Sequence, residues 1–304
     1  MSKNQTSRTA RTSWQAATFV VALALAMLTI GHTSDARAAD KSSLRILSIG
    51  SDVTEILYEL GFGDQIVAVD TTSQYPPEAL ENKPNVGYMR ALSPEGVLSV
   101  GANLILASAG SGPPETIRAL KASSARYVEV PAGKSAEGIL TKVEAIAAAV
   151  DAADAGARLK DKLAAEFKKL GQTARTVTKK KKVLFVLNAT GGRIIVGGAG
   201  TSADEILRLA AADNAAANVT GFKPLTTESV IAMAPDAIIV MKGGRGGLDA
   251  AELGRVPAIR LTPAGKAGEL RDMSGVFLLG FGPRAPKAAA SLIAWLYPER
   301  AGSQ

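Results

Sequence analysis

The chain has 304 residues, of which 47% are hydrophobic and 21% charged, a composition that indicates a globular protein and excludes a largely disordered one. It contains no cysteine and one histidine, His32, and its formal net charge is +7. No basic patch interleaved with aromatic residues accompanies this charge, so nucleic-acid binding is not expected. The basic run at residues 179–182 precedes an apolar segment and is most simply a solvated linker.

Residues 1–38 have the pattern of a secretory signal peptide. Three basic residues precede an apolar run over residues 14–30, and Ala36-Arg37-Ala38 provides small residues around a cleavage site near Ala38. A retained transmembrane anchor is the weaker alternative, because polar residues dilute the apolar run. Export without disulfides, and without a cysteine that could carry a lipid, favours the periplasm.

Cleavage near Ala38 changes the chemistry that the chain can perform. It removes four cations and one anion, which leaves 31 basic and 27 acidic side chains and a net charge of +4. It also removes His32, so the mature chain has neither histidine nor cysteine. Zinc, copper and thiolate sites, and nucleophiles activated by histidine, are therefore not expected. Tyrosine phenolate is the most capable remaining ligand for a transition metal.

The first part of the remaining chain alternates short apolar runs with helical segments. Strands are predicted at residues 45–50, 65–70, 103–107 and 126–130, and helices at 51–60, 93–99 and 115–122. In the helix at 93–99, Ser93 is the expected N-cap, Pro94 the first helical residue and Glu95 an acid in the first turn. Alternation of strands and helices predicts a parallel α/β sheet.

Between residues 135 and 171, apolar side chains recur at helical spacing. They predict one long helix of roughly 50 Å at 1.5 Å per residue, with a bend permitted near Gly156. The predicted organisation is an N-terminal lobe at residues 39–134, this connecting helix at 135–171 and a C-terminal lobe at 172–304.

The α/β pattern resumes in the C-terminal lobe. Strands are predicted at residues 182–187, 193–196, 236–241, 258–261 and 276–279, and helices from residue 202 and over 286–296. Residues 197–202 superficially resemble a phosphate-binding loop, but the lysine of that loop is missing. A turn bordering the ligand cleft is the better interpretation.

An internal repeat relates the two lobes. Residues 92–106 align without gaps on residues 225–239, at an offset of 133, so that Glu95 falls on Glu228 and Arg90 on Lys223. Ligands of such sheets bind beyond the carboxyl ends of the strands. We therefore expect a ligand cleft between two similar Rossmann-like lobes, bordered by the loops after residues 107 and 241.

Three segments carry a resemblance to a known family: Asp70-Thr-Thr-Ser-Gln-Tyr-Pro76, Gly87-Tyr-Met-Arg-Ala-Leu-Ser-Pro-Glu-Gly96 and Leu278-Leu-Gly-Phe-Gly-Pro-Arg284. Over about residues 45–296 the chain resembles the class III periplasmic binding proteins of ABC importers for haem, vitamin B12 and ferric siderophores. The three segments resemble the haem-binding branch. The resemblance implies a monomeric carrier without catalytic activity that delivers haem to an inner-membrane ABC permease, and it is compatible with an outer-membrane haem receptor upstream.

Alternatives remain at this stage. A siderophore or cobalamin carrier of the same fold is the first of them. A secreted hydrolase ranks far lower, because the chain lacks a Gly-x-Ser-x-Gly elbow and the mature chain lacks a histidine base.

The resemblance also implies roles for individual residues. It makes Tyr88 the axial ligand of ferric haem iron, a role that phenolate can fill, and a cation at Arg90 favours the charged form of the phenol. Packing of Tyr88 on the helix that follows is the alternative. The family places an arginine near the ligand at Arg245, although a solvated arginine in a glycine-rich loop is nearly as well supported. Lys223 is expected at a haem propionate on symmetry alone, and Tyr75 is left undecided.

Two further implications concern stoichiometry and the transporter. Some members of the family hold a second haem through a histidine in the other lobe. The mature chain has no histidine, so one haem is expected here. The family's lobe-tip glutamates, matched by Glu95 and Glu228, meet arginines of the permease. The alternative is that each glutamate only favours the positive end of its helix.

Overall fold

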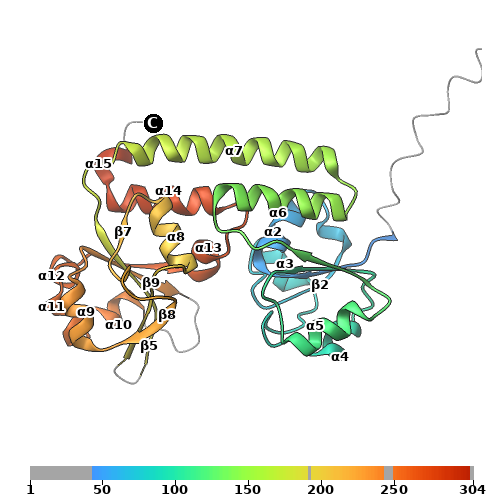
Figure 1. Ribbon diagram of the computed structural model, residues 1–304, viewed down its shortest axis with the longest axis horizontal. Helices are drawn as coiled ribbons and strands as arrows, with labels where there is room; N and C mark the ends of the chain where they lie inside the picture. Colours follow the sequence, from blue (N-terminus) through green and yellow to red (C-terminus); the bar gives the residue numbers. More distant parts are fainter. Residues whose placement is uncertain (1–42, 191–192, 243–248, 302–304) are drawn as a thin grey trace, which may run out of the picture. The chain divides into compact units, whose positions relative to one another are not determined.

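The computed structural model describes residues 43–190, 193–242 and 249–301, and a compact α/β body begins at Leu44 (Figure 1). The predicted signal peptide and Arg245 lie outside the described residues. Within the described ranges, none of the helices combines the length and the apolar character needed to span a membrane.

The N-terminal lobe is built on a four-stranded parallel sheet with the order β2-β1-β3-β4. Its strands are β1 (Ile46–Ile49), β2 (Ile66–Val69), β3 (Leu104–Ser108) and β4 (Arg126–Val130). Its helical segments are α2 (Ser51–Glu59), η2 (Gly63–Gln65), α3 (Pro77–Asn82), α4 (Pro94–Leu98) and α5 (Pro114–Lys121). Strands β1 and β3 are buried along their whole length, as expected for a parallel sheet covered on both faces. All four strands predicted for this lobe are confirmed.

The C-terminal lobe contains a mixed six-stranded sheet with the order β10-β9-β5-β6-β8, in which β7 pairs with β5. The strands are β5 (Lys182–Thr190), β6 (Arg193–Gly197), β7 (Asp213–Asn214), β8 (Phe222–Leu225), β9 (Ala237–Lys242) and β10 (Leu270–Ser274). Strands β5, β7, β9 and β10 are parallel, whereas β6 runs antiparallel to both β5 and β8. The predicted α/β fold with two lobes is confirmed.

Two strands predicted for this lobe are wrong. Residues 258–261 belong to α11 (Pro257–Leu261), and residues 276–279 belong to α13 (Gly275–Leu279). Pro257 starts the first of these helices, and the Ser274 hydroxyl accepts a hydrogen bond from the Phe277 amide at the start of the second. These start signals outweigh short apolar runs, which fit a helix as well as a strand.

The strand that closes the sheet is instead β10, whose sequence is Leu-Arg-Asp-Met-Ser. None of its residues is fully buried, and it pairs only with β9 along the described chain. An edge strand of this kind shows little apolar pattern. The remaining helices of the lobe are α8 (Ser202–Leu209), α9 (Thr227–Met233), α10 (Ala250–Leu253), α12 (Pro263–Ala267), α14 (Ala285–Leu296) and α15 (Pro298–Ala301).

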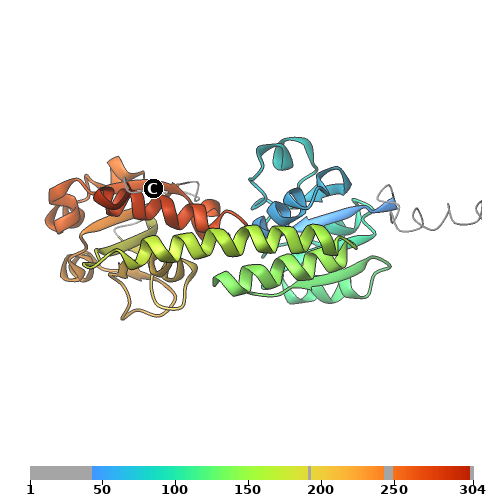
Figure 2. The ribbon, with the colours of Figure 1, turned by 90° about the horizontal axis from the view of Figure 1, so that it is seen from above.

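The long helix predicted over residues 135–171 is divided into α6 (Ala136–Ala149) and α7 (Ala153–Arg175). The break comes at Asp151, whose φ of 54° is left-handed and cannot continue a helix. Helix α7 packs on α6 and also on α14 and α8, so it extends from the N-terminal to the C-terminal lobe (Figure 2). Its 23 residues span about 34 Å at 1.5 Å per residue.

The internal repeat is visible in the element boundaries. Helix α4 starts at Pro94 and α9 starts at Thr227, 133 residues later. Strands β3 and β9 start at Leu104 and Ala237, with the same offset. Each helix has a hydroxyl N-cap: Ser93 accepts a hydrogen bond from the Gly96 amide and Thr226 accepts one from the Ser229 amide. The two lobes therefore share a helix–strand unit as well as a general architecture.

Two glycines of α7 allow a matched test of how closely α6 and α7 pack. A Cβ on Gly156 would lie 2.4 Å from the Cβ of Ala147 in α6, whereas a Cβ on Gly171 would have no other atom within 4 Å. We expect Gly156→Ala to lower the free energy of unfolding by about 1–3 kcal/mol through overpacking. We expect Gly171→Ala to raise it by up to about 1 kcal/mol through helix propensity. Urea denaturation of both variants measures this, and equal effects would contradict the close packing.

Candidate functional site

Tyr88 lies at the carboxyl end of β2, in the loop before α4. The chain returns beside β2 through a parallel bridge between Val69 and Asn85. The Thr71 amide then donates a hydrogen bond to the Gly87 carbonyl (2.9 Å), which joins the loop after β2 to the loop that carries Tyr88. Gly87 has a φ of 97°, a conformation that favours glycine. The backbone thus delivers Tyr88 to the sheet edge where ligands of such folds bind.

The Tyr88 side chain is exposed and paired with a cation. Its residue surface is 43% accessible, and Arg90 Nη1 donates a hydrogen bond to Tyr88 Oη (3.0 Å). The Arg90 side chain therefore lies against the Tyr88 phenol. A phenol in this position is open to a ligand on one side and held by a guanidinium on the other. The phenol oxygen of a tyrosine is one of the protein ligands that haem iron accepts.

Carboxylate-, histidine- or cysteine-based metal sites are not seen in the described part of the chain. Groups of three or more such side chains that could hold an ion do not occur in residues 43–190, 193–242 and 249–301. Tyr58 and Tyr127 are partly buried and pack against the hydrophobic cores. Burial raises the pKa of Tyr127 to about 12, with Glu129 adding to the effect. Tyr88 is therefore better suited to bind a metal than either of them.

The other residues predicted for the ligand are not gathered around Tyr88 by any described contact. Lys223 is exposed on β8, opposite Val196 of β6, and no hydrogen bond among the described residues joins it to Tyr88 or Arg90. Lys223 and Arg90 occupy equivalent positions of the repeat, but the two segments that carry them have different structures. The segment before α9 is a paired strand, whereas the segment before α4 is the loop that holds Tyr88 and Arg90.

Glu95 and Glu228 occupy equivalent places in the two lobes. Both are exposed in the first turn of their helices, α4 and α9. The Glu228 backbone amide and the Thr226 hydroxyl lower the pKa of the Glu228 carboxyl by hydrogen bonding, so this residue stays charged at neutral pH. Either glutamate is accessible to a protein partner.

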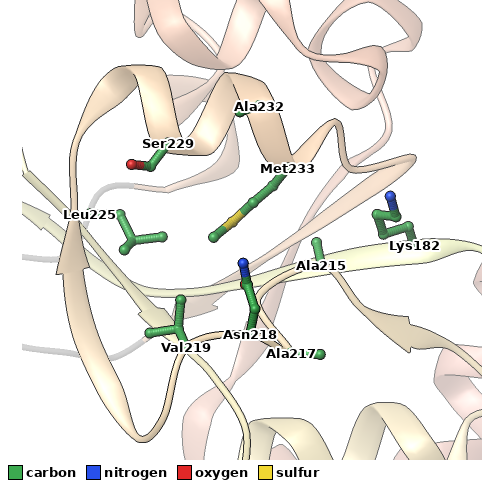
Figure 3. Close-up of a pocket in the computed structure, with 9 residues that line it drawn as sticks. All are labelled: Lys182, Ala215, Ala217, Asn218, Val219, Leu225, Ser229, Ala232 and Met233. Carbon is green, nitrogen blue, oxygen red and sulfur yellow. The ribbon is translucent and has the colours of Figure 1, made fainter.

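Beside α9 lies a groove of about 560 Å³ (Figure 3). Its lining is formed by Lys182, Ala215, Ala217, Asn218, Val219, Leu225, Ser229, Ala232 and Met233. The Met233 side chain reaches over the groove towards Asn218, with Leu225 and Val219 to one side (Figure 3). None of the predicted ligand residues lines this groove, so it does not belong to the Tyr88 site.

A buried ion pair that the sequence did not reveal joins α2 to the segment before α14. Arg284 donates to both carboxylate oxygens of Glu55, at 3.0 Å from Nε and 2.6 Å from Nη2. The side chains are 4% accessible for Glu55 and 20% for Arg284. The guanidinium also lies 3.7 Å from the centre of the Tyr75 ring, which places Tyr75, undecided from sequence, against Arg284.

A second buried pair lies one turn earlier on α2. Lys142 of α6 contacts Asp52 (2.6 Å) and donates to the Phe281 carbonyl (3.1 Å). Asp52 also accepts a hydrogen bond from the Ser108 hydroxyl at the end of β3. Burial raises the pKa of Glu55, and the nearby Asp52 carboxylate adds to this, while Arg284 opposes both effects. The two anions of α2 thus depend on two cations from other elements.

Residues 278–284 pack so closely against α2 that glycine is needed at position 282. A Cβ on Gly282 would lie 3.1 Å from a Glu55 oxygen and 3.2 Å from the Asp52 Cα, so the chain runs directly over α2. Phe281, although not a glycine, has a φ of 49° and is buried. Such a conformation persists only where the surroundings enforce it. The one available signal was the pair of acids at positions 52 and 55 on an otherwise largely apolar buried helix face.

The Glu55–Arg284 pair makes stability depend on pH in a way that variants can isolate. Arg284→Met leaves the buried Glu55 carboxylate unpaired, and we expect it to cost about 3–5 kcal/mol of unfolding free energy near neutral pH. The double variant Glu55→Gln/Arg284→Met should be more stable than the single one, because no charge is stranded. Loss of Arg284 raises the pKa of Glu55 further.

The difference between the single and double variants should therefore be largest near neutral pH. It should vanish as the pH falls below the ordinary glutamate pKa of 4.5, because Glu55 is then protonated in both the folded and the unfolded state. Urea denaturation at several pH values measures the difference, and a difference that does not change with pH would contradict this account.

Comparison with known proteins adds independent information on the fold. A family model described as periplasmic binding protein matches residues 46–275. The structure of the periplasmic heme-binding protein BhuT in complex with two hemes is 36% identical, with a TM-score of 0.79, over 84% of this chain and 99% of that chain. The apo heme-binding protein RhuT from Roseiflexus sp. RS-1 is 34% identical, with a TM-score of 0.79, over 85% and 99% of the two chains.

Curated relatives point to the same group of proteins. The uncharacterized ABC transporter substrate-binding lipoprotein YvrC of Bacillus subtilis (strain 168) is 31% identical over 206 residues, which are 67% of this chain and 65% of the relative. A vitamin B12-binding protein of Vibrio cholerae (strain O395) is 38% identical over 77 residues, 25% of this chain and 28% of the relative. These alignments span less than two thirds of either curated relative. The predicted resemblance is confirmed.

Proposed function

The chain belongs to the periplasmic binding protein family, and we propose that it is an extracytoplasmic carrier that binds ferric haem through Tyr88 and delivers it to an ABC importer. The family and the matched structures are substrate-binding transport proteins, which supports a carrier without catalytic activity. We propose the periplasm as its location, after removal of residues 1–38.

The observation that carries the proposal is the exposed phenol of Tyr88 with Arg90 hydrogen-bonded to its oxygen at 3.0 Å. Ferric iron supplies a Lewis acid that displaces the phenolic proton, and Arg90 stabilises the negative charge left on the oxygen. Neither step needs a histidine or a cysteine, which the mature chain lacks. An unpaired exposed tyrosine would support the proposal far less.

We further propose that one haem is bound, in a cleft between the two lobes. The mature chain contains no histidine that could hold a second haem iron. Arg245 and Lys223 are the proposed partners of the propionates, because the family resemblance implies an arginine near the ligand at Arg245 and the repeat aligns Lys223 with Arg90. The matched BhuT structure holds two hemes. A titration with haemin therefore has to determine the number of haems bound per chain.

Cobalamin is the second candidate ligand. Several vitamin B12-binding proteins align with parts of this chain, although over a quarter to two thirds of its length. A corrin brings its own cobalt ligands and does not need a protein phenolate. Haem, in contrast, has open axial positions, so the Tyr88–Arg90 pair favours haem.

The first test is a titration of the purified apo-protein with haemin and, separately, with cyanocobalamin. We expect a one-to-one complex with haemin, with a high-spin ferric tyrosinate spectrum. Tyr88→Phe keeps the ring and removes the ligand oxygen, so it should lose that spectrum and release haem at least about tenfold faster, equivalent to about 1.4 kcal/mol. Tyr127→Phe, at a partly buried tyrosine, is the matched control and should behave as wild type.

An unchanged haem spectrum in Tyr88→Phe would show that the ligand is assigned wrongly. Tight cobalamin binding without haemin binding would replace the proposed cargo while keeping the carrier function.

Docking to the importer is proposed for Glu95 and Glu228. An importer with two membrane subunits presents two equivalent surfaces, and these two exposed acids sit 133 residues apart at equivalent places in the repeat. Charge pairs at an interface set the encounter rate and the register of the complex. The competing explanation, that each acid only favours its helix end, predicts no effect on transport.

The charge-reversal variant Glu95→Lys/Glu228→Lys separates these explanations. We expect haem affinity to stay near wild type, because both residues lie outside the Tyr88–Arg90 pair, and haem uptake driven by ATP to fall at least about tenfold in proteoliposomes with the cognate importer. Glu115→Lys and Glu137→Lys are matched controls, since both residues are exposed acids in the first turn of their helices, α5 and α6. Wild-type uptake by the double variant would rule out docking through these residues.

A further inference from the structure

The contact of α2 with α6 and residues 280–284 holds the two most buried ion pairs in the described part of the chain, and the carrier function does not use it. It consists of four side chains, Asp52, Glu55, Lys142 and Arg284, which we call the interlobe brace. Both acids come from α2 of the N-terminal lobe, and Lys142 comes from α6. Arg284 immediately precedes α14, a helix whose neighbours include α8 of the C-terminal lobe.

The brace is complete in both charge and hydrogen bonds. Its two carboxylates face two cations, and each cation makes two contacts: Arg284 with both oxygens of Glu55, and Lys142 with Asp52 and the Phe281 carbonyl. Lys142 therefore ties α6 to the backbone of the segment that carries Arg284. Separating α2 from this segment would break these bonds and expose or strand buried charge.

Other polar contacts between the lobes are weaker. Lys134, before α6, donates to the Gly200 carbonyl (2.9 Å), but this lysine is exposed. An exposed pair contributes little, because water competes for both partners. The loss of one partner from a buried pair is costly. The brace is therefore the polar contact best able to resist a change in the relative position of the lobes.

The brace also reaches the ligand side of the N-terminal lobe. The Arg284 guanidinium stacks on the ring of Tyr75, which lies in the loop after β2. That loop is joined to the Tyr88 loop by the bond from the Thr71 amide to the Gly87 carbonyl. A shift of Arg284 relative to α2 would therefore also move the Tyr75 loop, which is bonded to the loop of the proposed ligand residue Tyr88.

We propose that the interlobe brace fixes the separation of the two lobes and thereby limits the rate at which the bound ligand leaves. The part that concerns release rests on the proposed haem-carrier function. The part that concerns lobe separation does not, because it applies to the protein without ligand.

The chain contains no cysteine, so lobe separation can be measured with spin labels on two introduced cysteines. Arg118→Cys in α5 and Lys266→Cys in α12 place labels on exposed helices of the two lobes. Pulsed electron double resonance on the apo-protein then gives the distance distribution. We expect Glu55→Gln/Arg284→Met to broaden or shift that distribution.

The matched control is Glu144→Gln/Lys160→Met. This pair also joins two helices, α6 and α7, but it lies within the helical hairpin and is exposed. It should leave the distribution unchanged. Arg284→Lys keeps the charge and loses the two-point contact, so it should give a smaller change in the same direction, and it serves if the double variant does not fold as judged by circular dichroism.

The second readout is haem release to an excess of apomyoglobin. The brace variant should release haem at least about fivefold faster than wild type, and the control variant at the wild-type rate. A wild-type distance distribution in a folded brace variant would overturn the proposal whatever the ligand is. Failure of the wild-type protein to bind haemin would overturn the proposed cargo, and the distance measurement on the apo-protein would still decide on the brace.

Discussion

Two acids on one buried helix set the arrangement of this protein. Asp52 and Glu55 lie on α2, which packs against β1 and β3 of the N-terminal sheet, and a carboxylate buried there must pair with a cation or lose its charge. Lys142 and Arg284 meet this demand from α6 and from the segment before α14. The close approach of residues 280–284 to α2, with its glycines and the left-handed Phe281, follows from satisfying these charges.

The same constraint links stability to the candidate site. Arg284 neutralises Glu55 on one side and supports the Tyr75 ring on the other. The loop that carries Tyr75 is hydrogen-bonded to the loop of Tyr88. The exposed phenol is therefore connected through Tyr75 and Arg284 to the buried Glu55 carboxylate. Under the proposed function, a side chain held in this way would lose little conformational freedom on binding, which favours affinity.

The local parts of this structure could be predicted from the sequence, because their causes are local. The four parallel strands, the Ser93 cap and the Tyr88–Arg90 pair all follow from residues within a few positions of one another. The hairpin of α6 and α7 was missed because the apolar pattern continues through the break at Asp151. The Glu55–Arg284 pair was missed because 229 residues separate its partners, and no periodicity reports such a contact.

The shared offset of 133 residues also bears on how the chain arose. A cap, a helix start and a strand start that all recur at one spacing are what duplication of an ancestor of half the size leaves behind. The two units differ just ahead of the cap, where one has a loop with a phenol and a guanidinium and the other a strand paired in a sheet. Metal chemistry in such a lineage can be gained or lost in one copy without disturbing the unit that follows in either.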